Sequence, residues 1–259
     1  MTALGPDAFY SAKLRIGRAQ EHLADLEARF NSFFSEKPYT RITEPDPNGT
    51  HEIYKLRLTK QFPFRWRILA TELIEHARAS IDHATWASAY LHTRNPDLKF
   101  GVLAFVRKPE HFEARLKGAS KDCPPEIQAF LSTLKPYQGG NDLLWIMNDM
   151  CNLSKHALVT FLAGATVSGT IKGTGQWGPI QFIEPLLLDP VKNEIPYMRV
   201  LRGTNPQHEI DFAIFPTIQY REFTSEEPAI YVFGTMINES IRIVRDIESK
   251  CRRIGLIST

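Results

Sequence analysis

One stretch of the sequence constrains the fold more than any other: between residues 64 and 93, apolar side chains recur every three or four positions. This spacing places them along one stripe of an α-helix. The stripe consists of Trp66, Leu69, Ala70, Leu73, Ala77, Ile81, Ala84, Ala87 and Leu91. Pro63 lies near the start of the helix, and Asn95 and Pro96 end it. The pattern is typical of a helix in the core of a bundle.

Other segments have helical spacing or strand-like alternation. Further helices are predicted at residues 6–34, 109–117, 125–134, 143–163 and 229–254, and Asp142 is the expected cap of the fourth. Strands are predicted at residues 51–59, 166–171, 180–188, 197–201 and 209–220. The sequence therefore predicts an α+β fold, which combines a helical bundle, an antiparallel β-sheet subregion and a C-terminal helix.

The order of these elements suggests how the chain is organised. We expect residues 1–163 to form the helical bundle with a short strand insertion, and residues 164–228 to form the antiparallel β subregion. Residues 229–259 are expected to form a C-terminal helix that packs back on the bundle. Because that helix returns to the bundle, the parts are expected to be subregions rather than separable domains.

Composition and short motifs argue against several classes of function. Of the 259 residues, 43% are hydrophobic and 23% are charged, as in folded globular proteins. A net charge of +2 is too small for a general polyanion binder. The cysteine spacing does not fit a zinc knuckle, and the sequence has no phosphate-binding loop, dinucleotide fingerprint or nucleophile elbow. We therefore expect neither a cofactor nor a bound metal.

The sequence also predicts where the protein resides. Its first 20 residues lack the apolar core of a signal peptide. No run approaches the ~18 apolar residues that a membrane span requires. We therefore expect a cytoplasmic protein without membrane contact.

The first candidate site lies within the long helix, at Arg78, Asp82 and His83. A guanidinium can hold a phosphate through two hydrogen bonds, and an imidazole can transfer a proton near neutral pH. On an ideal helix, the step from Arg78 to His83 turns through about 500°, so the two side chains lie about 140° apart. A joint site would need a second helix, a second subunit or a local distortion of the helix. The same residues also fit an ion pair from Arg78 to Asp82, four positions later.

Further polar residues extend this candidate site. The residues expected to line it are His76, Asn152, Lys155 and His156. Glu72, His76 and His83 share one helix face, but the two histidines are about 10 Å apart along the axis, too far to share one metal without another ligand. Asn148, Asn152 and His156 form a polar ridge on the helix at 143–163. The ridge indicates either a buried hydrogen-bond network or one wall of a site.

Three segments, RASIDHATWA, KPYQGGNDLLWIMNDM and NLSKHALV, resemble a family of uncharacterised bacterial and phage proteins. That family has a helix like LRSALDHLAW, then QPY, then N-x-x-DKH. The matching residues are Arg78, Asp82, His83, Trp86, Pro136, Tyr137, Asn152, Lys155 and His156. The sequence departs from the family at Ser154, where an acidic residue is usual. The resemblance covers roughly residues 60–160.

The arginine and histidine separated by four residues also resemble the signature of the HEPN superfamily. Members of that superfamily are helical and often dimeric, and they include metal-independent endoribonucleases of toxin and defence systems. In this sequence Ala79 follows the arginine, where a polar residue is usual. The resemblance implies catalytic roles for Arg78 and His83 only.

The resemblance leads to one functional hypothesis and the residues leave two others open. The first is a HEPN-like RNase that is homodimeric, acts on RNA and has an antitoxin or defence-complex partner. In it, His83 transfers protons, Arg78 stabilises phosphoryl charge, and Asp82 or Asn152 orients His83. The second is a non-catalytic binding or assembly module in which the motif is a structural network. The third is a metal-dependent hydrolase with His76, His83 and His156 as ligands.

Overall fold

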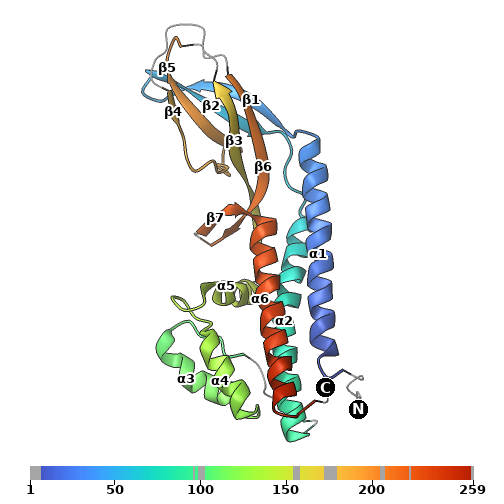
Figure 1. Ribbon diagram of the computed structural model, residues 1–259. Coiled ribbons are helices and arrows are strands. Elements are labelled where there is room, and N and C mark those ends of the chain that lie inside the picture. The colour runs from blue at the N-terminus through green and yellow to red at the C-terminus, as the bar shows by residue number, and fades with distance from the viewer. Residues whose placement is uncertain are drawn as a thin grey trace. The chain divides into compact units, whose positions relative to one another are not determined.

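The fold combines helices with antiparallel β-sheet, as the sequence predicted, and its last element is a long helix (Figure 1). The computed structural model describes residues 7–95, 97–98, 103–153, 158–171, 180–204, 208–221 and 223–257. The helices are α1 (Tyr10–Ser35), α2 (Arg65–Thr93), the 3-10 helix η1 (Pro109–His111), α3 (Phe112–Ala119), α4 (Pro125–Leu134), α5 (Asp142–Leu153) and α6 (Ala229–Arg253). The strands are β1 (Tyr39–Pro45), β2 (His51–Leu58), β3 (Thr160–Ile171), β4 (Ile180–Phe182), β5 (Glu194–Leu201), β6 (His208–Tyr220) and β7 (Phe223–Pro228).

The chain divides into two compact units. The helical unit comprises the described residues of Met1–Asp25, Ile68–Leu158 and Phe233–Thr259, and the sheet unit those of Leu26–Arg67 and Val159–Val232. This division differs from the predicted subregions 1–163, 164–228 and 229–259. The reason is that β2 pairs antiparallel with β5, so the strands expected as an insertion in the bundle belong to the later sheet.

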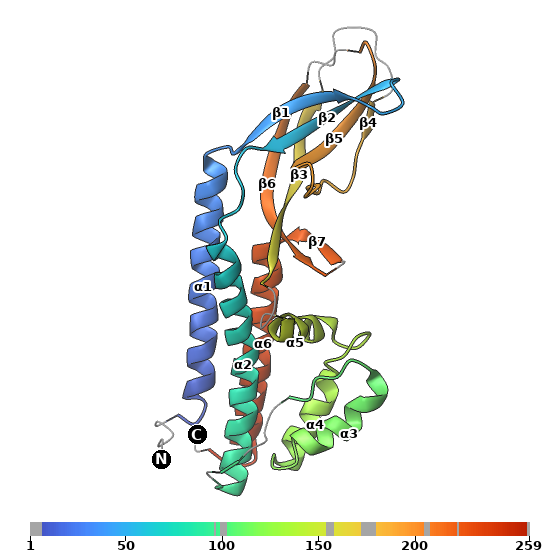
Figure 2. The ribbon, with the colours of Figure 1, turned by 180° about the vertical axis from the view of Figure 1, so that it is seen from behind.

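In the helical unit, α1, α2 and α6 lie side by side in both views (Figures 1 and 2). The apolar stripe of α2 is fully buried at Ala70, Leu73, Ala77, Ile81 and Ala84, each with 0% of its surface exposed. Burial of a continuous stripe of this kind is what stabilises a helix within a bundle. The α2 helix is therefore the centre of the unit, and its polar residues lie at the edges of the stripe.

The sheet unit contains a four-stranded sheet in the order β1-β2-β5-β4 and a three-stranded sheet in the order β3-β6-β7. Apolar side chains from both sheets share one core, which includes Leu56, Leu162 and Tyr197. The segment after β4 runs along β3, because the Ala165 N–H donates to the Leu186 carbonyl at 2.9 Å. That segment therefore links the two sheets along their shared core.

The helix predicted at residues 143–163 is correct in its first half and wrong in its second. α5 ends at Leu153, and residues 160–163 begin β3. Gly164 lies inside this strand, where a Cβ atom would be 2.7 Å from Cε2 of Phe215 on β6. The glycine therefore allows close approach of an aromatic ring within a sheet.

The predicted cap of α5 is also wrong by one residue. The Asn141 Oδ1 atom accepts a hydrogen bond from the Leu144 N–H at 3.1 Å, which is the usual arrangement of an N-cap side chain. Asp142 accepts instead from the Gly139 N–H at 2.8 Å and fixes the preceding turn. Asn141 is therefore the residue that caps the helix.

Two strands were not predicted. β1 ends in Pro45, and β7 has the polar sequence FTSEEP, so neither has the apolar alternation that marks a half-buried strand. Both strands form through pairing with a neighbour, β1 with β2 and β7 with β6. Among the helices built from described residues, none is long and apolar enough to cross a membrane.

The central position of α2 makes a testable prediction about stability. Ile81→Ala removes a side chain with 0% exposure, and it should lower the free energy of unfolding by about 2–5 kcal/mol because a cavity remains. Ile68 on the same helix is 41% exposed, so Ile68→Ala is the matched control and should have a much smaller effect. Urea denaturation of both variants measures the difference. Equal losses would contradict the burial of the stripe.

Candidate functional site

The candidate site begins at Arg78, whose guanidinium contacts groups from three parts of the helical unit. Its Nε atom donates to Oδ1 of Asn148 on α5 at 3.0 Å. Its Nη1 atom forms an ion pair with Asp82, one turn later on α2. Its flat face lies over the ring of Phe105, 4.7 Å from the centroid. Burial lowers the pKa of Arg78 from its usual value, but a guanidinium remains charged at neutral pH.

Asp82 uses only one carboxylate oxygen in this network. Oδ2 accepts from Arg78, and the buried Oδ1 has no hydrogen-bond partner among the described residues. The side chain is 21% exposed, and that of Arg78 is 23% exposed. The pair is therefore partly shielded from water, where an ion pair is stronger than at an open surface.

His83 lies against a different helix. Its Nδ1 atom contacts the hydroxyl of Ser11 on α1, and the imidazole is half-buried. Burial lowers the pKa of His83 below its usual 6.5, and the charge of Arg15 on α1 lowers it further. His83 is therefore mostly neutral near pH 7. It faces α1, whereas Arg78 faces α5.

His76 also faces α1, about two turns before His83. The Arg15 Nη1 atom donates to the Nδ1 atom of His76 at 3.0 Å. The imidazole stacks on that of His22, with centroids 5.6 Å apart, and His22 lies 3.7 Å from a carboxylate oxygen of Glu72. The shared face of Glu72, His76 and His83 predicted from the sequence is thus a contact with α1.

The structure brings together part of the predicted site. Arg78 and Asp82 are joined, as the ion-pair alternative expected, while His83 and His76 lie against α1. Asn152 is exposed, and no described residue pairs with its side chain. Lys155 and His156 lie outside the described residues.

Some contributing residues were not singled out in the sequence. Ser11, Arg15 and His22 are spaced by four and seven residues on α1, so helical spacing alone places them on one face. That spacing could have identified the three residues from the sequence as one polar face of α1. Phe105 lies in an irregular segment, where no periodic pattern points to it.

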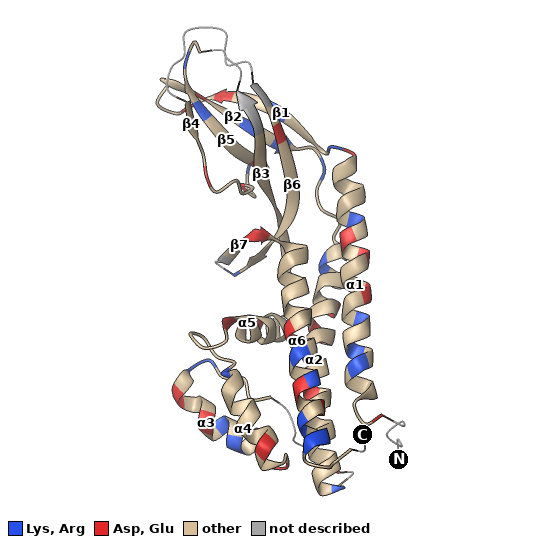
Figure 3. Cartoon of the chain, viewed as in Figure 1, with Lys and Arg blue, Asp and Glu red and all other residues tan. Residues whose placement is uncertain are grey.

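The metal-dependent hypothesis needs His156, which lies outside the described residues. Within the described ranges, no group of three or more His, Cys, Asp or Glu side chains is placed to hold a metal ion. The basic residues of α6 are interspersed with acidic ones (Figure 3). Arg242 is paired with Glu239 and Asp246, and Arg252 with Glu248. The end of α6 is therefore a mixed-charge surface.

Comparison of the chain with protein-family models, with curated proteins and with solved structures finds no match in any of the three.

The environment of His76 predicts how stability depends on pH. Burial lowers its pKa below 6.5, the charges of Arg15, His22 and Arg18 add to this effect, and Glu72 opposes it. The unfolded chain therefore binds more protons than the folded one below about pH 6.5, so the free energy of unfolding should fall as the pH drops from about 7.5 to 5.5.

The measurement is the urea midpoint across that pH range. His76→Gln removes the titrating group, so its midpoint should depend less on pH than that of the unaltered chain. His92→Gln, at an exposed position near the end of α2, is the control for the loss of a histidine as such. A steeper dependence for His76→Gln would contradict the lowered pKa.

Proposed function

We propose that the chain is a non-catalytic assembly module, in which the Arg78 motif holds the helical unit together and the sheet unit offers an edge to a partner protein. The proposal rests on the contacts that the Arg78 guanidinium makes. Nε donates to Asn148, and Nη1 donates to Asp82. The flat face of the guanidinium lies over Phe105. These contacts connect α2, α5 and the segment that precedes η1.

The network commits Nε and Nη1 of Arg78, two of the three guanidinium nitrogens. An arginine that holds a phosphate bidentately needs two free N–H groups pointing at the anion, so the network restricts a catalytic role. If Arg78 turned away, the carboxylate of Asp82 would lose its described partner, and a hydrogen bond to a charged group contributes about 1.5–3 kcal/mol. This cost supports a structural role for the motif.

The edge of the four-stranded sheet supports the second part of the proposal. β1 pairs with β2 along its whole length, from Tyr39 to Pro45, and no other strand among the described residues pairs with it. Thr40 and Thr43 on β1 are exposed. An exposed edge strand can accept an extended segment of another protein by main-chain hydrogen bonding.

The structural role predicts a loss of stability when the network is broken. Arg78→Ala should lower the free energy of unfolding by about 1.5–3 kcal/mol, because it removes hydrogen bonds between charged and polar groups that are shielded from water. Arg242→Ala is the control: Arg242 pairs with Asp246 at i,i+4 and with Glu239 at i,i+3, but its side chain is 47% exposed. Loss of these two exposed pairs should cost about 1 kcal/mol or less. Equal effects would remove the support for a structural network.

A second candidate is a metal-independent endoribonuclease of a defence or toxin system, built on a HEPN-like bundle. One observation favours it: the lowered pKa of His83 keeps the imidazole neutral near pH 7, as a general base requires. His83 would take the proton of a ribose 2′-OH, whose oxygen attacks phosphorus as the 5′-oxygen leaves. Because Arg78 faces α5, charge stabilisation would come from Arg78 of a second copy, so this candidate requires a homodimer.

Cleavage of RNA separates the two candidates. The assembly module should leave total tRNA intact, with or without EDTA, at any concentration of the chain. The endoribonuclease would produce 2′,3′-cyclic phosphate ends in EDTA and spare substrates that lack the 2′-OH. Loss of that activity in His83→Gln, with the melting temperature unchanged, would overturn the assembly module as the leading proposal.

A further inference from the structure

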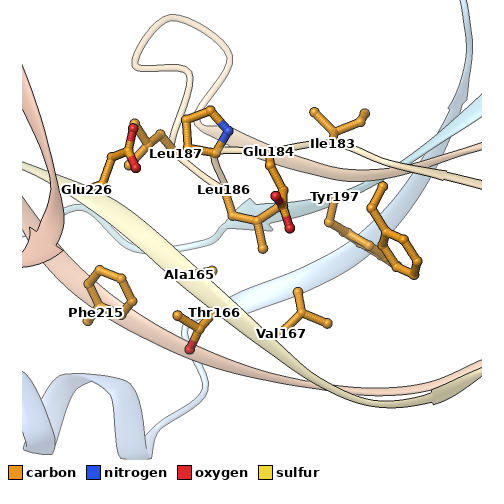
Figure 4. A pocket seen from close by; sticks show the side chains of 12 residues that line it. Ala165, Thr166, Val167, Ile183, Glu184, Leu186, Leu187, Tyr197, Phe215 and Glu226 are labelled. Atoms are coloured by element: carbon orange, nitrogen blue, oxygen red, sulfur yellow. The ribbon is translucent and has the colours of Figure 1, made fainter.

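The sheet unit contains a pocket of about 620 Å³ that plays no part in the Arg78 network. Its walls come from β3, from the segment 182–187 and from single residues of β5, β6 and β7. Figure 4 shows Glu226 and Phe215 at one end of the pocket and Tyr197 toward the other, with Glu184 between them. The volume falls within the range of about 300–1,000 Å³ that is typical of small-molecule sites.

The walls of the pocket are held by backbone contacts. The Leu188 N–H donates to the carbonyl of Ala163 at 2.9 Å, next to the bond from Ala165 to Leu186. Gly164 lies opposite Leu187 in an isolated bridge and leaves the space that the Phe215 ring occupies. A pocket with walls fixed in this way is formed before a ligand arrives, which lowers the cost of binding.

The charge of the pocket is negative and uncompensated. Of its lining residues, Glu184 and Glu226 are the ionisable carboxylic acids, and none is Lys, Arg or His. No described residue forms an ion pair or a hydrogen bond with either carboxylate, so both remain available to a ligand. Both residues are exposed, so they attract a cation as charges near water do, and that attraction weakens as salt rises.

The remaining walls favour a ligand with an apolar body. Val167, Leu186 and Phe215 contribute apolar surface, and Tyr197 adds a second aromatic ring. Burial of a ligand's apolar atoms against such walls is favourable, and an aromatic face also attracts a cation within about 6 Å. The carboxylates would repel a phosphate or another anion. We propose that this pocket binds a small organic cation, an ammonium or guanidinium group carried on an apolar body.

The experiment measures binding of three probes that share an aromatic body and differ in charge. Phenethylamine carries an ammonium group, phenethyl alcohol is neutral, and phenylacetate is anionic. Isothermal titration of the full chain should detect the amine, with affinity that falls as salt rises. The alcohol should bind with at least about five-fold lower affinity, because one ion pair near water contributes about a five-fold gain in affinity. The acid should not bind, because the carboxylates repel it.

Substitutions then assign the binding to the pocket. Glu184→Gln and Glu226→Gln keep the shape of each side chain and remove its charge, so each should weaken amine binding by about five-fold. Glu227→Gln is the matched control, because Glu227 is exposed and adjacent to Glu226 but does not line the pocket. Melting curves show whether each variant is folded, and Val167→Trp provides a second, steric block that does not depend on charge.

Three results would overturn the proposal. The first is amine binding no tighter than alcohol binding, and the second is unchanged amine affinity in Glu184→Gln, Glu226→Gln and Val167→Trp. The third is no detectable binding at millimolar concentration by either phenethylamine or agmatine, which carries a guanidinium on an aliphatic chain. Because none of these measurements involves Arg78, the result is independent of the role of the helical unit.

Discussion

Burial of one apolar stripe on α2 determines where the other groups of the helical unit lie. Ala70, Ala77 and Ala84 have 0% exposure and alternate along the helix with Leu73 and Ile81, which are equally buried. Small side chains allow neighbouring helices to approach closely, and the larger ones fill the space between them. The polar residues next to the stripe therefore lie in helix–helix contacts, where a polar group needs a partner.

That requirement explains why the motif on α2 is divided between two neighbours. Arg78 and His83 cannot share a face of one helix, and the structure gives each its own set of contacts. Arg78 is neutralised locally by Asp82, because residues four positions apart on a helix lie side by side. His83 lies beside Ser11, and burial together with the charge of Arg15 lowers its pKa, which favours the neutral imidazole. The same buried stripe therefore places Arg78 in a network between helices. It leaves His83 as a neutral imidazole that contacts α1.

The sheet unit contains both paired carboxylates and carboxylates without a described partner. Around β2 and β5, Lys55 and Arg57 form ion pairs with Glu194, so the buried carboxylate is compensated. The pocket between β3 and the segment after β4 has Glu184 and Glu226 without such partners. A chain with a net charge of only +2 can thus contain a locally negative site. Net charge describes the whole chain, whereas recognition depends on the few charges that face a cavity.

The sequence by itself determined the helices α1, α2, α4 and α6 to within a few residues, because apolar spacing is a local property that burial only reinforces. It also determined that Arg78 and His83 diverge. Tertiary structure alone decided that residues 160–163 pair as a strand and that β1 and β7 exist, since their partners lie far away in the chain. It also decided which helix faces His83, and it assembled the pocket from five separate strands and segments. Contacts between distant segments depend on how all the apolar surfaces are buried together, and no local pattern encodes that arrangement.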